Sequence, residues 1–271
     1  MHRRQLIAAA GALALAACAP DPDRRRPDDV EELRYGSDRS QFAELSRTAA
    51  ATSLGVVVVI HGGFWRDGFD LSLGRPLARS LVEEGWDVLN LEYRRVGGGG
   101  GFPQTFDDVA DGIDLLAETD LATDRVITLG HSAGGHLAVW AAALGTLQDS
   151  PWGTPRVPVT AAVSQAGVLD LAGAADVNLG GGAAQALMGG PPDASWRLAD
   201  PAQQVPLPVP VRCVHAADDQ VVPIGQSAAY VDRARAAGAD AELVEVPGDH
   251  FSVIDTASEA WRSTLTVLRD L

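Results

Sequence analysis

Apolar runs and segments with helical spacing alternate along most of the chain. Short runs rich in valine, isoleucine and leucine predict strands, and the continuous β-branched run at residues 55–60 predicts a central strand buried on both faces. Strands are predicted at residues 30–35, 55–60, 86–93, 125–129, 157–165, 209–215 and 241–246. Helices are predicted at residues 71–84, 106–118, 135–144, 226–237 and 256–271. This alternation is typical of an α/β protein whose mostly parallel sheet carries helices on both faces.

Three segments lack a regular pattern. We expect residues 36–53 to form a polar stretch after a first edge strand, and the five glycines at residues 97–101 to form a flexible connection. These glycines lack the strand-to-helix G-x-G-x-x-G frame of a phosphate-binding loop. Residues 167–205 contain clusters of glycine and proline, which indicate loops and short helices.

The first 29 residues differ in character from the rest. Residues 1–17 combine a positively charged start with an apolar segment too short to span a bilayer, so they predict an export signal. The Leu-Ala-Ala-Cys sequence ending at Cys18 resembles a bacterial lipobox, which implies cleavage before Cys18 and its lipidation. We therefore expect residues 18–29 to tether a domain at residues 30–271 to the outer side of the cytoplasmic membrane, in the cell envelope, through the lipid only.

Composition narrows the possible functions. The 271-residue chain has a formal net charge of −15, which argues against binding to nucleic acid or to anionic lipid. All 21 basic residues are arginine, and the absence of lysine excludes P-loop and Schiff-base chemistry. Cys213 lies in a predicted strand, so we expect a buried thiol and no disulfide. The histidines and acidic residues show no zinc-ligand spacing, so we expect no metal and no cofactor.

Residues 130–134, Gly-His-Ser-Ala-Gly, lie between the predicted strand at 125–129 and the predicted helix at 135–144. In that context, G-x-S-x-G predicts a nucleophile elbow with Ser132 on a strained turn. Side chains two residues to either side would collide in such a turn, so it requires Gly130 and Gly134. The N-terminus of the following helix would direct its free N–H groups toward an oxyanion.

The elbow, the His-Gly-Gly-Phe-Trp sequence at residues 61–65 and the strand–helix alternation together resemble the α/β-hydrolase superfamily. Within it, the chain is similar to the esterase and lipase branch with an H-G-G-x-W loop. That branch includes hormone-sensitive-lipase-like carboxylesterases and kynurenine formamidases. The resemblance extends from about residue 30 to the end of the chain. It implies an α/β-hydrolase fold and a Ser-His-Asp triad with Ser132 as the nucleophile.

The family order of nucleophile, acid and histidine implies that the general base is the last of the three in the chain. His250 lies on a loop after the last predicted strand, in the sequence Pro-Gly-Asp-His-Phe, and matches that position. We expect His61 and His131 to brace backbone within the two motifs. We expect His136 and His215 to be structural residues.

The acid has several candidates. Residues 215–223 resemble the family frame H-G-x-x-D-x-x-V-P, which implies Asp219 as the acid, although alanine replaces the usual glycine at position 216. Asp218 falls on a variable position of that frame. Asp170 follows the preceding predicted strand, where some members of the superfamily carry their acid. Asp218 and Asp170 therefore remain alternatives, whereas Asp249 is adjacent to His250 and is expected to point away.

Donors for the oxyanion are expected from two places. The backbone N–H of Ala133 directly follows the nucleophile, and the resemblance to an H-G-G-G loop implies the N–H groups of Gly63 and Phe64. Phe64 stands where the family has a glycine, which keeps the backbone donor but adds bulk. We expect Trp65 to line the substrate pocket, together with Phe64 and residues 167–205.

These features predict hydrolysis of a small-molecule carboxylic ester through an acyl-enzyme on Ser132. Two alternatives remain open. One is an arylformamidase that hydrolyses an N-formyl amide, which the similarity to kynurenine formamidases implies. The other is a surface-tethered binding protein on a hydrolase fold. Export would separate the protein from cytosolic tryptophan breakdown, which favours the ester.

Overall fold

The computed structural model describes residues 30–147 and 149–271. The predicted signal at residues 1–17 and the predicted lipidation site Cys18 lie outside the described residues. None of the helices in the described ranges is long and apolar enough to cross a membrane.

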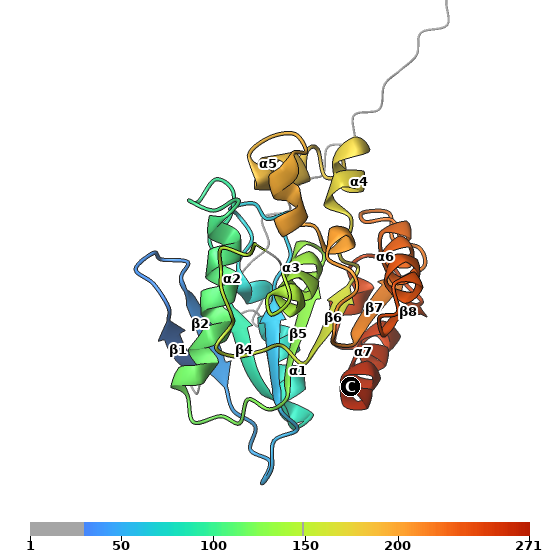
Figure 1. Cartoon of the computed structure of the whole chain (residues 1–271). Coiled ribbons are helices and arrows are strands. Elements are labelled where there is room, and N and C mark those ends of the chain that lie inside the picture. The colour runs from blue at the N-terminus through green and yellow to red at the C-terminus, as the bar shows by residue number, and fades with distance from the viewer. Residues whose placement is uncertain (1–29, 148) are drawn as a thin grey trace, which may run out of the picture.

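The described chain forms one eight-stranded sheet in the order β1-β2-β4-β3-β5-β6-β7-β8 (Figure 1). Strands β3 to β8 pair in parallel, whereas β2 pairs antiparallel with both β1 and β4. The predicted mostly parallel sheet is therefore confirmed. The strands are β1 (Glu31–Arg34), β2 (Phe42–Ser46), β3 (Val56–Ile60), β4 (Asp87–Leu91), β5 (Val126–His131), β6 (Ala161–Gln165), β7 (Val211–Ala216) and β8 (Ala241–Val246).

The predicted central strand is β3, in which all five residues are buried. It lies between β4 and β5, and pairs Ile60 with Leu91 on one side and with Gly130 on the other. β-Branched residues suit this position because both faces of the strand are covered. The register places the ends of β3 and β5 together, so the segments that follow them leave the sheet at the same edge.

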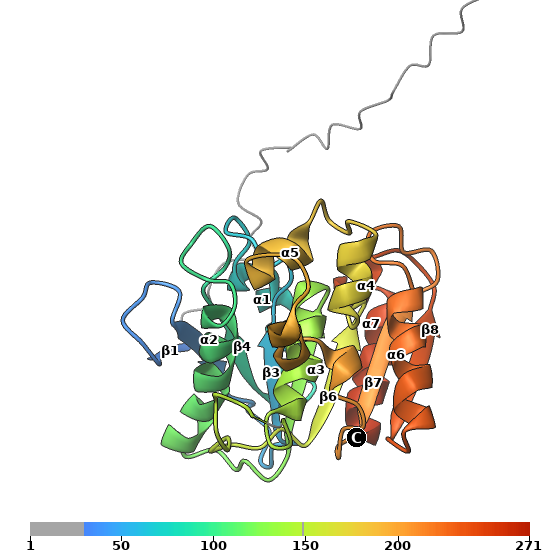
Figure 2. The same ribbon diagram turned by 45° about the horizontal axis from the view of Figure 1, so that its top comes forward.

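Helices cover both faces of the sheet (Figures 1 and 2). Val56, Val58 and Ile60 pack in one core with α2, α3 and α6, whereas Val57 and Val59 pack in a second core with α1 and α7. Successive strand residues point to opposite faces, so these are the two sides of the sheet. The α-helices are α1 (Arg75–Glu83), α2 (Gln104–Asp114), α3 (Ala133–Ala143), α4 (Leu171–Asp176), α5 (Ala183–Met188), α6 (Gly225–Ala236) and α7 (Glu259–Asp270).

Strand β2 was missed by the sequence prediction, which expected an irregular polar stretch there. Its central residue Glu44 is only 3% exposed and pairs with Arg75 of α1 at 2.7 Å. In a sequence, a glutamate in a short run normally indicates a surface position. The arginine that neutralises Glu44 is distant in the sequence, so the local pattern does not reveal that this glutamate is buried. The predicted helix at 71–84 is likewise divided, into a 3₁₀ helix (Leu71–Leu73) and α1, with Gly74 between them.

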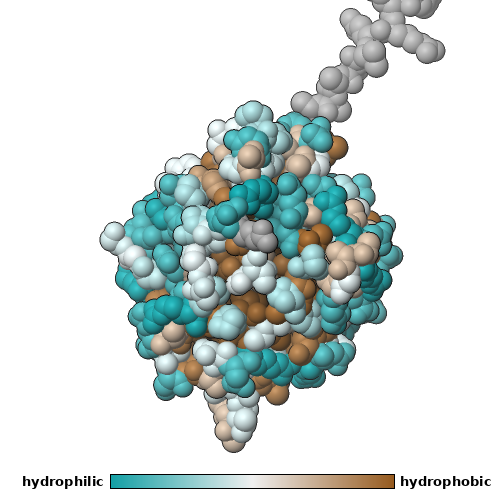
Figure 3. All heavy atoms as spheres, viewed as in Figure 1, coloured by the Kyte–Doolittle hydropathy of each residue, from teal (hydrophilic) through white to brown (hydrophobic). Residues whose placement is uncertain are grey.

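Residues 167–205 form short helices, as predicted. They comprise α4, α5 and the 3₁₀ helices Ala194–Leu198 and Pro201–Gln203. In Figure 1, α4 and α5 lie at the top of the view, above the layers of longer helices. Figure 3 shows the molecule from the same side as Figure 1, with hydrophobic residues gathered near the centre of the view and hydrophilic residues around them.

Candidate active site

Ser132 lies between the end of β5 and the start of α3, on the turn that the sequence predicts. Its backbone has φ 55° and ψ −117°, and the residue is 4% exposed. Non-glycine residues rarely adopt positive φ, so the surrounding structure must hold this strained conformation. The next residue, Ala133, opens α3, where N–H groups have no carbonyl partner within the helix.

Steric crowding by neighbouring backbone requires glycine at both positions of the elbow, Gly130 and Gly134. A methyl group on Gly130 would come within 2.0 Å of the Gly134 carbonyl oxygen, and one on Gly134 would come within 2.0 Å of the Ile60 carbonyl oxygen. Both contacts are with backbone, which cannot move aside as a flexible side chain could. The predicted requirement for small residues on both sides of Ser132 is confirmed.

His250 and Asp219 form a buried pair. The Nδ1 atom of His250 lies 2.6 Å from Asp219 Oδ2, while Asp219 Oδ1 accepts the N–H groups of Val221 and Val222, each at 2.8 Å. Burial by itself would raise the pKa of Asp219, but hydrogen bonds from His215, His250 and backbone outweigh it and hold this pKa well below its usual range. Because Nδ1 faces the carboxylate, Nε2 is the His250 atom left to exchange a proton.

The other candidate acids have different surroundings. Asp170 caps α4 by accepting the N–H of Gly173 at 2.8 Å. Asp249 is exposed and accepts the N–H groups of Phe251 and Ser252, so it turns away from the imidazole as expected. Asp218 is exposed and precedes the buried Asp219. Of the four, Asp219 alone contacts His250 within the described residues.

The elbow and the His250 loop lie side by side. His131, which precedes Ser132, has Nε2 2.8 Å from the carbonyl oxygen of His250, and the two imidazole rings have centroids 4.5 Å apart. Burial is the largest cause that lowers the pKa of His131, to about 3, so its ring is neutral and Nε2–H donates to the carbonyl. Within the described ranges Ser132 Oγ makes no hydrogen bond to His250, and such bonds are often long before a substrate binds.

The segment from His61 to Trp65 lies directly against the elbow, and we call it the oxyanion loop because the sequence predicts oxyanion donors there. A methyl group on Gly62 would be 3.3 Å from Ser132 Cβ and 2.8 Å from the His131 carbonyl oxygen. Gly63, Phe64 and Trp65 have φ values of 116°, 55° and 55°, so three successive residues have positive φ. This conformation turns the loop sharply at the end of β3.

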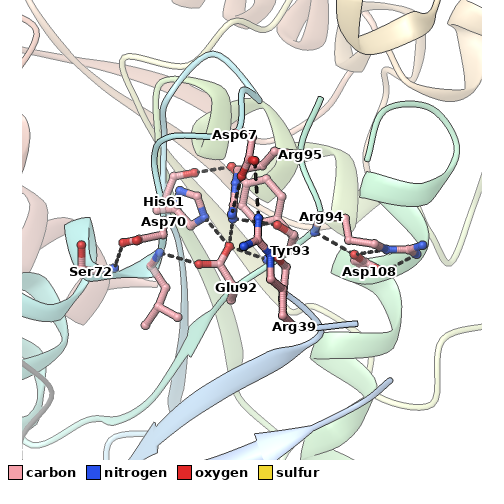
Figure 4. Close-up of polar contacts among 12 residues, drawn as sticks. Arg39, His61, Asp67, Asp70, Ser72, Glu92, Tyr93, Arg94, Arg95 and Asp108 are labelled. Carbon is pink, nitrogen blue, oxygen red and sulfur yellow. Dashed lines mark hydrogen bonds and ion pairs between the residues drawn. The ribbon is translucent and has the colours of Figure 1, made fainter. Parts of the chain in front are cut away.

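A buried network behind the oxyanion loop was not found by the sequence analysis (Figure 4). The Tyr93 hydroxyl donates to the His61 carbonyl oxygen at 2.7 Å, and the two rings stack with centroids 4.4 Å apart. The Glu92 carboxylate lies 3.2 Å from His61 Nε2, accepts the N–H of Leu71 at 2.9 Å and pairs with Arg95. In the sequence, this network is indicated only by the charged residues around the end of the predicted strand at 86–93, and the pattern does not identify the residues with which they pair.

Trp65 lies deeper than the sequence analysis expected. It is 2% exposed, and its ring meets that of His136 edge-on with centroids 5.2 Å apart. The neighbouring Phe64 is only partly buried, and its ring carries the Arg66 guanidinium 5.7 Å from its centroid. A contact between Trp65 and substrate stays a prediction.

His136, His215 and Cys213 are buried, and His215 Nε2 also lies 3.2 Å from Asp219 Oδ2; that these residues have structural roles stays a prediction. His136 Nε2 lies 2.7 Å from the Ala199 carbonyl oxygen, and burial lowers its pKa to about 4. His215 Nδ1 and Nε2 lie 2.8 Å from Ser227 Oγ and 2.9 Å from the Val222 carbonyl oxygen. Cys213 is a buried free thiol whose pKa burial raises to about 12. The described ranges contain no group of three potential metal ligands.

The fold is shared with several solved structures. A truncated carbohydrate esterase from gut microbiota has a TM-score of 0.77 at 20% identity, over 93% of this chain and 98% of that chain. An acetyl ester-xyloside bifunctional hydrolase from Caldicellulosiruptor lactoaceticus has a TM-score of 0.71 at 20% identity, over 89% and 94%. Esterase 2 of Thermogutta terrifontis has a TM-score of 0.71 at 19% identity, over 90% and 91%.

Sequence comparison places the chain in a family. No curated protein matches it. The BD-FAE family model matches residues 45–233, a segment that includes the oxyanion loop, the elbow and Asp219 and that ends before His250. Because this match covers more than half of the chain, the chain belongs to the BD-FAE family, an esterase family of the α/β-hydrolase type.

Proposed function

We propose that this protein hydrolyses carboxylic esters through an acyl-enzyme on Ser132, with His250 as general base and Asp219 as the acid that orients it. The observation that carries the proposal is the buried His250–Asp219 pair, with Nδ1 and Oδ2 2.6 Å apart, on a loop held against a strained serine elbow. Strain of this kind persists only where the surrounding structure maintains it.

In the proposed reaction, Ser132 Oγ attacks the ester carbonyl carbon while His250 Nε2 accepts the hydroxyl proton. The imidazolium that forms is stabilised by Asp219, whose lowered pKa keeps it ionised. His250 then gives the proton to the leaving alcohol oxygen. A water molecule attacks the acyl-enzyme, again losing its proton to His250, and the acid is released.

The negative charge on the carbonyl oxygen needs donors that are already in place. The N–H of Ala133 at the start of α3 is one donor, and the N–H groups of Gly63 and Phe64 on the adjoining loop are the others. A single donor of this kind contributes about 2.7–4 kcal/mol to the stability of a transition state. The positive φ values at residues 63–65 orient this loop, and the buried network behind the loop keeps the loop in place.

The comparisons support an ester as the substrate. The structures of similar fold belong to proteins named as a carbohydrate esterase, an acetyl ester-xyloside hydrolase and an esterase. The Thermogutta terrifontis esterase 2 also has a structure phosphonylated by sarin, at a TM-score of 0.73. Organophosphorus reagents are therefore suitable probes of Ser132.

The test compares the protein with its Ser132→Ala variant on p-nitrophenyl esters from acetate to decanoate, with N-formylkynurenine in parallel. Ser263→Ala on α7 is the matched control. We expect Ser132→Ala to lower kcat at least about a thousandfold and to abolish labelling by a fluorophosphonate, while Ser263→Ala retains both. Turnover of the formyl amide alone would make the protein an arylformamidase. Absence of turnover and of labelling would favour a binding protein.

A further inference from the structure

A second histidine contacts the proposed catalytic acid. His215 belongs to β7, and its fully buried imidazole reaches both the loop that carries Asp219 and the start of α6. Its Nε2 atom lies 3.2 Å from Asp219 Oδ2, the same oxygen that His250 Nδ1 approaches at 2.6 Å. Its Nδ1 atom lies 2.8 Å from Ser227 Oγ of α6. One carboxylate oxygen therefore faces the ring nitrogens of two histidines.

The surroundings of His215 fix its tautomer. Both groups near Nε2 are acceptors, namely the Val222 carbonyl oxygen at 2.9 Å and the Asp219 carboxylate, so Nε2 carries the proton. Nδ1 is then an acceptor, and the hydroxyl of Ser227 donates to it. Ser227 is fully buried on α6, so this donor cannot exchange for water. His215 therefore presents a fixed N–H dipole to Asp219.

Other titratable groups around the two rings are neutral or exposed. Burial lowers the pKa of His131 on the elbow to about 3. Burial also raises the pKa of Cys213 on β7 to about 12, and that of Tyr230 on α6 well above its usual range. The neighbouring carboxylates Asp218 and Asp249 are exposed to water. The carboxylate that the two rings share is therefore the charge to which both respond.

We propose that His215 is a positioning residue for the general base, because its N–H holds Asp219 in place and takes up part of the negative charge that faces His250. This inference rests on the proposed function, and it gives His215 a role beyond the structural one expected from the sequence. A carboxylate that loses one donor attracts the remaining donor more strongly. Without the N–H of His215, Asp219 would stabilise the imidazolium form of His250 more, and His250 would become a free base only at higher pH.

The test compares two amide variants of His215. In His215→Gln the amide nitrogen can take the position of Nε2 and still donate to Asp219, whereas in His215→Asn it reaches only the position of Nδ1, near Ser227. The measurement is kcat/KM on p-nitrophenyl acetate as a function of pH, and the readout is the pH of half-maximal activity on the acidic side. We expect His215→Asn to raise this pH by about half a unit and to lower the maximum about tenfold, and His215→Gln to restore both to near wild type.

His136→Asn is the matched control. The imidazole of His136 is also fully buried, and its Nε2 lies 2.7 Å from a backbone carbonyl oxygen, that of Ala199. We expect this variant to leave the pH of half-maximal activity unchanged, whatever it does to the maximum. If His215→Asn and His215→Gln lower the maximum equally and leave that pH unchanged, His215 only supports the end of β7 and the positioning role is wrong.

Proton NMR separates this inference from the proposed function, because it needs no turnover. The resonance followed is that of the His250 Nδ1 proton, identified by its loss in His250→Gln. We expect it to move downfield in His215→Asn, as the hydrogen bond to Asp219 strengthens, and to stay in place in His215→Gln. This result supports the positioning role even if the protein hydrolyses no ester, whereas an unchanged resonance in His215→Asn overturns it.

Discussion

Asp218 and Asp219 are neighbours in the chain with opposite surroundings. Asp219 is buried, accepts two backbone N–H groups and contacts His250, whereas Asp218 is exposed. The family frame distinguished the two in the sequence by position alone. The structure supplies the physical difference, because only a carboxylate held by fixed donors can keep an imidazole in one orientation.

This pair of residues provides a test at the residue scale. We expect Asp219→Asn to lower kcat on p-nitrophenyl acetate by about 10³–10⁴-fold with little change in KM, because an amide favours the wrong tautomer of His250. Asp218→Asn should remain within twofold of wild type. If Asp219→Asn stays active and Asp170→Asn does not, the acid has been assigned to the wrong strand.

At the scale of elements, the oxyanion loop depends on the segment after β4. Tyr93 holds the His61 carbonyl oxygen, and the N–H of Val96 donates to the Trp65 carbonyl oxygen at 2.8 Å. The two ends of the loop are therefore fixed by a segment that carries none of the proposed catalytic residues. Motif matching finds the loop, but the residues that brace it follow a different strand, about 30 positions later.

Tyr93→Phe isolates this bracing role. The ring that stacks on His61 remains, and only the hydroxyl that donates to the His61 carbonyl oxygen is lost. We expect kcat to fall about tenfold with KM unchanged, because the oxyanion donors act mainly in the transition state. Tyr230→Phe, which removes a hydroxyl from a buried tyrosine of α6, is the control and should keep kcat. A rise in KM with kcat unchanged would contradict the bracing role.

At the scale of the whole molecule, burial of neutral histidines links folding to pH. Burial is the largest cause of the lowered pKa values of His61 and His131, to about 3, and of His136, to about 4. An unfolded histidine has a pKa of about 6.5, so the unfolded chain takes up protons on acidification that the folded chain does not. The free energy of unfolding therefore rises with pH between the folded-state and the unfolded-state pKa values of these histidines, and this stability is lost as the pH falls below about 6.5.

Denaturant unfolding between pH 5 and pH 8 measures this linkage. We expect the midpoint to be constant near pH 8 and to fall from pH 6.5 to pH 5, with uptake of about three protons on unfolding. The raised pKa values of Asp111 and Asp200 act in the opposite direction, but near the ordinary range of aspartate at about pH 4. His136→Gln should reduce the uptake by about one proton. A midpoint that does not change from pH 7 to pH 5 would contradict the buried neutral state.

Local sequence patterns determined much of the fold and of the candidate active site of this protein. The parallel sheet and the elbow around Ser132 follow from chain-local signals, because periodicity and the space left by glycine act over a few residues. The oxyanion loop was indicated by its resemblance to an H-G-G-G loop. Tertiary structure alone decided the pairing of β2 with β1 and β4, the ion pair of its buried Glu44 with Arg75, and the brace of Tyr93 on His61. These contacts depend on partners that folding brings together from distant segments. The local sequence around a buried charged or hydroxyl group does not identify the residue with which that group pairs.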